Sequence, residues 1–112
     1  MTIYKILRAD EWAALRKHRT MDGAPADLAD GFVHLSTGDQ VRETAARHFA
    51  GEDGLMLLAV DDLRLGDALR WEPSRGGDLY PHLYGSLLLD AVEWAQPLPW
   101  DGTAHRFPEG FA

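Results

Sequence analysis

The chain has 112 residues, of which 46% are hydrophobic, and a formal net charge of −7 from 11 basic and 18 acidic residues. This length and hydrophobic content predict one compact domain, residues 1–112, with a single core. The acidic balance argues against an extended nucleic-acid surface, because RNA and DNA binding depends on cations that neutralise phosphates. The absence of cysteine excludes disulfides, thiolate metal sites and a cysteine nucleophile.

The start of the chain, MTIYKILRADEW, lacks the basic end, long apolar stretch and cleavage site of a signal peptide. The longest apolar run, LMLLAV at residues 55–60, is too short to span a bilayer. We therefore expect a cytoplasmic protein without a membrane segment.

In the first third of the chain, residues 2–7 predict a strand that is largely apolar on both faces. Asp10 then predicts the N-cap of a helix that ends near Arg19. Residues 21–31, MDGAPADLADG, predict a loop, because glycine, proline and aspartate cluster there without a sustained period. Residues 32–35, FVHL, predict a short strand.

The segment STGDQ, residues 36–40, predicts a helix start. A capping box fits either Ser36 with Asp39 or Thr37 with Gln40. The residues that follow at i, i+4, i+7 and i+8 predict one inward helical face, made of Val41, Ala45, His48 and Phe49.

The second half of the chain reads mainly as strands. Residues 55–60 predict a central strand, and residues 61–68 a turn or a single helical turn. Residues 69–73 and 91–98 predict two further strands. We expect the irregular tail, residues 99–112, to lie on the body of the domain, because its aromatic side chains would otherwise be exposed. Early helices and late strands predict an α+β domain, and no GxGxxG or GxxxxGK phosphate loop is present.

His34 is the first candidate for chemistry. Alternation places it with Phe32 on one strand face, near the helix start at Ser36 and Thr37. Free amide groups at a helix start suit a phosphate or a carboxylate. The alternative is a structural histidine beside an ordinary helix cap.

Glu72 is the second candidate, at the end of the strand 69–73. We expect partial desolvation beside Trp71 to raise the pKa of Glu72, which would suit acid–base work or a hydrogen bond to a sugar hydroxyl. The alternative is a surface glutamate paired with Arg70 or Arg75.

His82, Tyr80 and Tyr84 alternate on one side of YPHLYG, next to the glycine pair Gly76 and Gly77. Three ring side chains on one face would form a stacking wall for a ligand, and they would equally serve a small core. His34, Glu72 and His82 also match the residue types of a two-histidine, one-carboxylate metal site, but no HxH or HExxH spacing supports one, so we predict no metal.

The segments DGFVHLST, RWEP and YPHLYG resemble those of domain-of-unknown-function family 952, small bacterial proteins without an established activity. This resemblance implies an ADP-ribosyltransferase-like fold: a curved, split β-sheet with small flanking helices and a cleft that holds NAD in relatives. FVHLS is similar to the HVHLS segment of RNA 2′-phosphotransferases, with Phe32 in place of the first histidine. Lys5 in IYKIL stands where such enzymes carry an NAD-binding histidine.

Two functions follow as expectations. The first is an NAD-utilising transferase or hydrolase with His34, Glu72 and His82 as catalytic residues and NAD as a substrate, with no required cofactor. The second is a non-catalytic module that binds a nucleotide-like or other small anionic ligand; a different enzyme and a protein adaptor also stay open. The expected ligand-binding residues are Lys5, Ser36, Thr37, Trp71, Arg75, Tyr80 and Tyr84.

Overall fold

A computed structural model describes residues 1–111 of the chain, except for the side chain of Arg75. The helices are α1 (Ala9–His18), α2 (Pro25–Asp30) and α3 (Val41–His48). The strands are β1 (Thr2–Leu7), β2 (Thr20–Met21), β3 (Val33–His34), β4 (Leu55–Asp61), β5 (Leu69–Pro73), β6 (Leu79–Leu83), β7 (Leu87–Leu88) and β8 (Val92–Leu98). Short 3₁₀ helices follow β4, β5 and β7, at Asp62–Ala68, Arg75–Gly77 and Leu89–Ala91.

The larger sheet is antiparallel, with strand order β1–β4–β8. The prediction that residues 55–60 form a central strand is therefore confirmed. Both faces of β4 are covered, so its continuous apolar run is buried. One face packs with Leu15 of α1 in a first core cluster, and the other packs with Val41 and Ala45 of α3 in a second.

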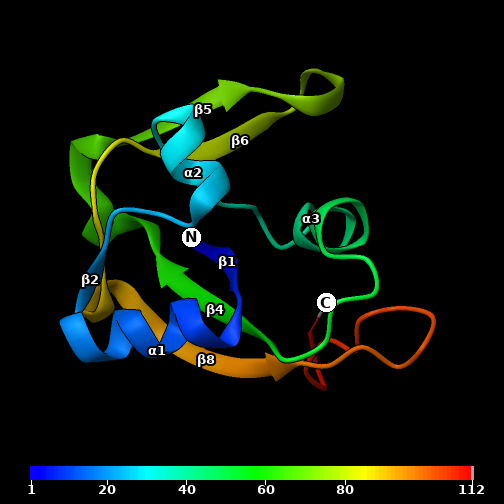
Figure 1. The fold of residues 1–112 in the computed structure, drawn as a ribbon. Coiled ribbons are helices and arrows are strands. Elements are labelled where there is room, and N and C mark those ends of the chain that lie inside the picture. The colour runs from blue at the N-terminus through cyan, green and yellow to red at the C-terminus, as the bar shows by residue number, and fades with distance from the viewer. Residues whose placement is uncertain (112) are drawn as a thin grey trace.

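The second sheet is also antiparallel, with order β3–β6–β5, and β2 and β7 form a separate pair. In Figure 1, β5 and β6 lie at one end of the molecule, and β4, β8 and α1 lie at the other. The two sheets are linked just after β3, where the backbone amides of Tyr4 and Ser36 each donate to the other residue's carbonyl, at 2.7 and 2.9 Å. The fold is thus an α+β domain, as predicted.

The prediction of a loop over residues 21–31 is wrong. This segment contains the helix α2, with Pro25 at its start and Gly31 in the left-handed conformation at its end. α2 has one buried residue, Asp27, so no apolar period reveals it in the sequence. Gly31 suits the helix end because glycine adopts positive φ without a steric penalty.

The start of α1 also differs from the prediction. The N-cap is Arg8 rather than Asp10, and the Glu11 carboxylate accepts a hydrogen bond from the Arg8 amide at 2.8 Å. Asp10 lies in the first turn, where its negative charge complements the helix dipole.

At the start of α3 the N-cap is Gln40, without a side-chain capping bond, so neither predicted capping box is complete. The Gln40 side chain accepts from the Thr37 amide at 3.0 Å. On the helix itself His48 is exposed, contrary to the predicted inward position, because the short helix ends there and the chain turns away at Phe49. The tail lies on the body as expected: Phe107 and Phe111 pack against the second core cluster.

Candidate functional site

The register of the β3–β6–β5 sheet divides its side chains between two faces. His34 pairs with His82, and His82 pairs with Arg70, so these three side chains lie in one row. Glu72 and Tyr80 form the next row on the same face, two residues along. We call this the polar face, defined by His34, Arg70, Glu72, Tyr80 and His82. The other face carries Val33, Leu69 and Leu83, which pack in the first core cluster.

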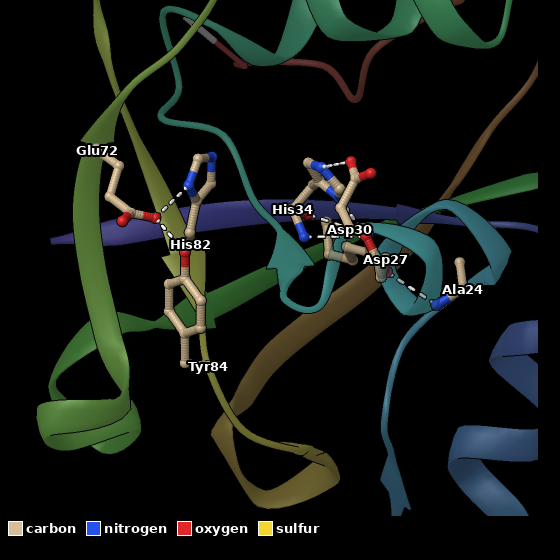
Figure 2. A network of polar contacts seen from close by, with 8 residues as sticks. Ala24, Asp27, Asp30, His34, Glu72, His82 and Tyr84 are labelled. Carbon is tan, nitrogen blue, oxygen red and sulfur yellow. Dashed lines mark hydrogen bonds and ion pairs between the residues drawn. The ribbon is translucent and has the colours of Figure 1, made fainter.

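Glu72 is the centre of one polar cluster on this face. Its Oε1 atom accepts from Nδ1 of His82 at 2.8 Å and from the hydroxyl of Tyr84 at 2.7 Å (Figure 2). Among the described residues, no side chain or amide donates to its second oxygen, Oε2. One carboxylate oxygen is thus held in place by two donors.

The electrostatics of Glu72 are opposite to the prediction. The hydrogen bonds from Tyr84 and His82 lower the pKa of Glu72 below its usual value, and they outweigh the effect of desolvation. The same bond to Glu72 raises the pKa of Tyr84. The prediction failed because it counted burial beside Trp71 and not the two donors that the fold brings to the carboxylate.

A second polar cluster surrounds the buried carboxylate of Asp27 in α2. Oδ1 accepts from Nδ1 of His34 at 2.6 Å and from the His34 amide at 3.0 Å. Oδ2 accepts from Nζ of Lys5 at 2.8 Å and from the Ala24 amide at 2.8 Å. The other ring nitrogen of His34, Nε2, lies 2.9 Å from the carboxylate of Asp30 (Figure 2).

These contacts explain the protonation state of Asp27. Burial alone would raise its pKa, but the hydrogen bond from His34, the charge of Lys5 and the backbone amide together hold it well below the usual value. Burial in turn lowers the pKa of Lys5, and the charge of Asp27 opposes this. Asp27 therefore forms the buried partner of both a lysine and a histidine.

Phe32 lies between the two clusters. Its ring centroid is 4.1 Å from that of His82, 4.6 Å from that of His34 and 5.3 Å from that of Tyr84. The guanidinium of Arg70 lies 5.3 Å from the Tyr84 ring centroid. Together with Asp27, Phe32 and Tyr84, the polar face therefore combines two imidazole–carboxylate pairs, tilted ring contacts and an exposed cation.

The structure brings the three predicted catalytic residues to one face. The His34 and His82 rings are 5.8 Å apart in an edge-to-face arrangement, and His82 binds Glu72. The exposed fractions differ, at 39% for the His34 side chain and 8% for the His82 side chain. Access to a ligand is therefore greater at His34 than at His82.

The predicted ligand-binding residues are divided. Tyr84 is exposed beside Glu72, and Tyr80 is buried on the polar face. Trp71 points to the opposite face, because it occupies the odd position between Arg70 and Glu72. The side chain of Arg75 lies outside the described part of the structure.

Three other predicted ligand contacts are occupied by the protein itself. Lys5 is buried and donates to Asp27 and to the carbonyl of His34. The hydroxyl of the buried Ser36 bonds that of Thr44 at 2.9 Å. The amide of Thr37 donates to Gln40, so the expected anion-binding amide at this position is not free.

Two pockets are found among the described residues, with volumes of about 270 and 470 Å³. Asp27 and Phe32 line the smaller one, but neither pocket is lined by His34, Glu72 or His82. Neither of these two pockets therefore includes the three predicted catalytic residues. In residues 1–111, side chain of Arg75 aside, no group of three or more histidine, aspartate or glutamate side chains is arranged to hold a metal ion.

Sequence reasoning did not select Asp27, Asp30, Phe32 or Arg70 as site residues. Arg70 could have been found, because it lies two residues before Glu72 in a predicted strand and so on the same face. Asp27 and Asp30 could not, because the segment that carries them was predicted to be a loop.

The chain is a small α+β domain with two histidine–carboxylate pairs at one face of its second sheet. Residues 6–95 match a family described as "Protein of unknown function (DUF952)", and the chain belongs to this family.

The solved structures most like this chain include protein CC0527 from Caulobacter crescentus, a structural-genomics target. The sequence in its X-ray structure is 46% identical to this chain, and the TM-score between the two structures is 0.91. The match covers 95% of this chain and 94% of that chain. For its solution NMR structure, the sequence identity is 47% and the TM-score is 0.82. This match covers 93% of this chain and 90% of that chain. No curated protein matches the chain. Within residues 1–111, no helix is long and apolar enough to cross a membrane.

Proposed function

We propose that the polar face binds a nucleotide-like ligand, with NAD as the first candidate, and cleaves the bond between nicotinamide and ribose. The observation that carries this proposal is the arrangement at Glu72. Two donors fix Oε1 of an ionised carboxylate, and Oε2 is left without a partner among the described residues. The similarity of FVHLS to a segment of NAD-using RNA 2′-phosphotransferases supports the same ligand.

An ionised carboxylate suits this reaction. When the nicotinamide–ribose bond breaks, the electron pair leaves with the nicotinamide nitrogen, and the sugar becomes a cation at C1′. A fixed carboxylate stabilises such a cation or accepts a hydrogen bond from a ribose hydroxyl. The lowered pKa of Glu72 keeps it charged at neutral pH, so its role is electrostatic rather than that of a general acid.

His82 is the candidate base for the second step. Because its Nδ1 donates to Glu72, the neutral ring carries its lone pair on Nε2, which has no hydrogen-bond partner among the described residues. Water or an acceptor hydroxyl attacks C1′, and its proton passes to Nε2. Water as the acceptor makes the protein a hydrolase, and a hydroxyl makes it a transferase.

Other residues on the polar face or beside it suit the remaining parts of such a ligand. Tyr84 is 43% exposed and offers a ring on which a nicotinamide or a base can stack. Arg70 is exposed beside it and supplies a positive charge for a pyrophosphate in a protein that is acidic overall. His34, between Asp27 and Asp30, borders the same rings through Phe32.

A binding-only function is the second candidate, and specific contacts favour it. The side chains of Lys5 and Ser36 are hydrogen-bonded to Asp27 and Thr44, so they are not available to a ligand. Neither of the two pockets described above includes His34, Glu72 or His82, and a reaction that must exclude water needs an enclosed site. If the function is binding alone, the same residues hold the ligand and no bond of the ligand is cleaved.

Calorimetry with NAD, ADP-ribose and nicotinamide tests binding, and chromatography of the NAD incubation tests nicotinamide release. If the protein is an enzyme, Glu72→Gln should lower the rate of nicotinamide release at least about a hundredfold, because the loss of one transition-state contact costs this order of magnitude. Asp10→Asn removes an exposed carboxylate on α1 and should leave release unchanged. Binding without release supports the module. No binding of NAD or ADP-ribose overturns both versions.

A further inference from the structure

A separate concave site lies on the other sheet, away from the polar face. In the β1–β4–β8 sheet, Tyr4, Ala59 and Trp94 form one row across the three strands. The small side chain of Ala59 lets the rings on either side approach, with 6.1 Å between the centroids of Tyr4 and Trp94. Phe111 from the tail meets Tyr4 edge to face at 5.1 Å. Three aromatic rings from distant parts of the chain thus come together.

These rings line the larger pocket, of about 470 Å³. This volume is within the range of roughly 300–1,000 Å³ that is typical of small-molecule sites. The residues that line it include the polar Asp39, Gln96 and Glu109. No residue of the polar face lines it, so this site is independent of the proposed function.

The charge around the pocket favours a cation. Asp39 and Glu109 are exposed at its edge, and their two full negative charges exceed the partial charge of about +0.5 at the start of α3. A third carboxylate, Glu93, contributes with burial to a raised pKa of Tyr4, so the negative potential reaches the ring hydroxyl.

Arg42 is a positive charge that contacts a residue of the pocket. Its guanidinium lies 5.4 Å from the Phe111 ring centroid and 4.5 Å from that of Phe107, and it donates to the carbonyl of Phe111 at 3.1 Å. Arg42 does not itself line the pocket, and its contacts hold the tail that supplies the third ring. Phe111 thus already contacts one cation from outside the pocket.

We propose that this pocket binds a small organic cation, an alkylammonium or methylated ammonium group, with its apolar surface on Tyr4, Trp94 and Phe111. Aromatic faces attract cations through the ring quadrupole, and methylated ammonium groups are recognised by such rings in other proteins. Asp39 and Glu109 supply the compensating charge. A neutral molecule of the same shape would lose both contributions.

The test uses choline and its neutral isostere 3,3-dimethyl-1-butanol, at ionic strength matched with sodium chloride. Binding is followed by NMR through the indole N–H of Trp94, assigned with Trp94→Phe. The proposal expects choline to shift this resonance to saturation and the isostere to leave it in place. Glu109→Gln should weaken choline binding about two- to fivefold, as for a partly exposed charge pair, and Asp39→Asn should do the same.

The control Asp10→Asn removes an equal charge on α1, and choline should bind it as it binds the unaltered protein. Equal binding of the isostere, saturation by phosphate in place of choline, or no saturable shift with choline would each overturn the proposal. All three carboxylate variants keep the aromatic rings, so loss of binding in them does not depend on loss of the fold.

Discussion

Lys5 and Asp27 form a buried ion pair that joins β1 to α2, with 2.8 Å between Nζ and Oδ2. Their exposed fractions are 7% and 2%. Asp27 also binds His34, so the pair anchors the polar face to the larger sheet. Lys5 is thus a structural cation, held by Asp27 and by the carbonyl of His34. This relationship gives the first prediction.

Lys5→Met should destabilise the protein by about 3–5 kcal/mol, because it leaves the carboxylate of Asp27 buried without its cation. Urea denaturation measures the free energy of unfolding. The double variant Lys5→Met/Asp27→Asn should lose less stability than Lys5→Met alone, because it leaves no buried carboxylate without its cation. Lys17→Met, on the exposed side of α1, should change stability by no more than about 0.5 kcal/mol. Equal losses in the single and double variants would contradict a charge-based effect.

The stability of the protein should fall on acidification partly through Asp27. Its folded pKa lies well below the ordinary value of 3.8, so the folded state favours the ionised form. The resulting stabilisation is complete above that ordinary value and is lost as the pH falls below it toward the folded pKa. Urea denaturation between pH 5 and pH 2.5 should therefore show a steeper loss for the unaltered protein than for Lys5→Met/Asp27→Asn. Parallel curves would show that Asp27 is not the group responsible.

Tyr84 should titrate above its ordinary pKa, because its hydroxyl donates to the negative carboxylate of Glu72. In Glu72→Gln the negative charge is absent, so the pKa of Tyr84 should move back toward its usual value of 10.0. The ¹³Cζ chemical shift of Tyr84 against pH measures this directly. Asp67→Asn, which removes a charge that makes no contact with Tyr84, should leave the titration in place. An unchanged Tyr84 curve in Glu72→Gln would mean that the hydrogen bond is absent in solution.

Gly23→Ala should be more damaging than Gly51→Ala. Both glycines have positive φ, +141° and +79°, so each alanine carries backbone strain of about 1–2 kcal/mol. At Gly23 the added Cβ would also meet Cβ of Asp27 at 2.5 Å, whereas nothing lies within 4 Å at Gly51. We expect an additional loss of about 1–3 kcal/mol at Gly23, measured by thermal unfolding. Similar losses at both positions would show that α2 moves to accommodate the methyl group.

The sequence by itself determined the main strands, from their apolar runs, their alternation and the turn residues that bound them. β1, β4, β5 and β8 were predicted within a residue or two, and β4 as the central strand, because a continuous apolar run must be buried on both faces. The tail was predicted to pack on the body from its aromatic content alone. These features depend on local composition and on burial, which a single sequence displays.

The candidate site was only partly visible in the sequence. Alternation predicted that Tyr80 and His82 share a face, and the structure places Glu72 there as well. Pattern alone could not pair Glu72 with His82, because the distance depends on the register between β5 and β6, which the turn at Arg75–Gly77 sets. The prediction from the sequence also assigned Trp71 and Glu72 to one ligand site, although adjacent residues of a strand point to opposite faces.

Tertiary structure alone decided the surroundings of Asp27. α2 was missed because its one buried side chain is a carboxylate, which carries no hydrophobic period. A buried aspartate is acceptable only where donors from other elements meet it, here Lys5 of β1 and His34 of β3. The same holds for the row of Tyr4, Ala59 and Trp94, which strand pairing brings together. Charge compensation and cross-strand contact are properties of segments far apart in the chain, so only the folded arrangement defines them.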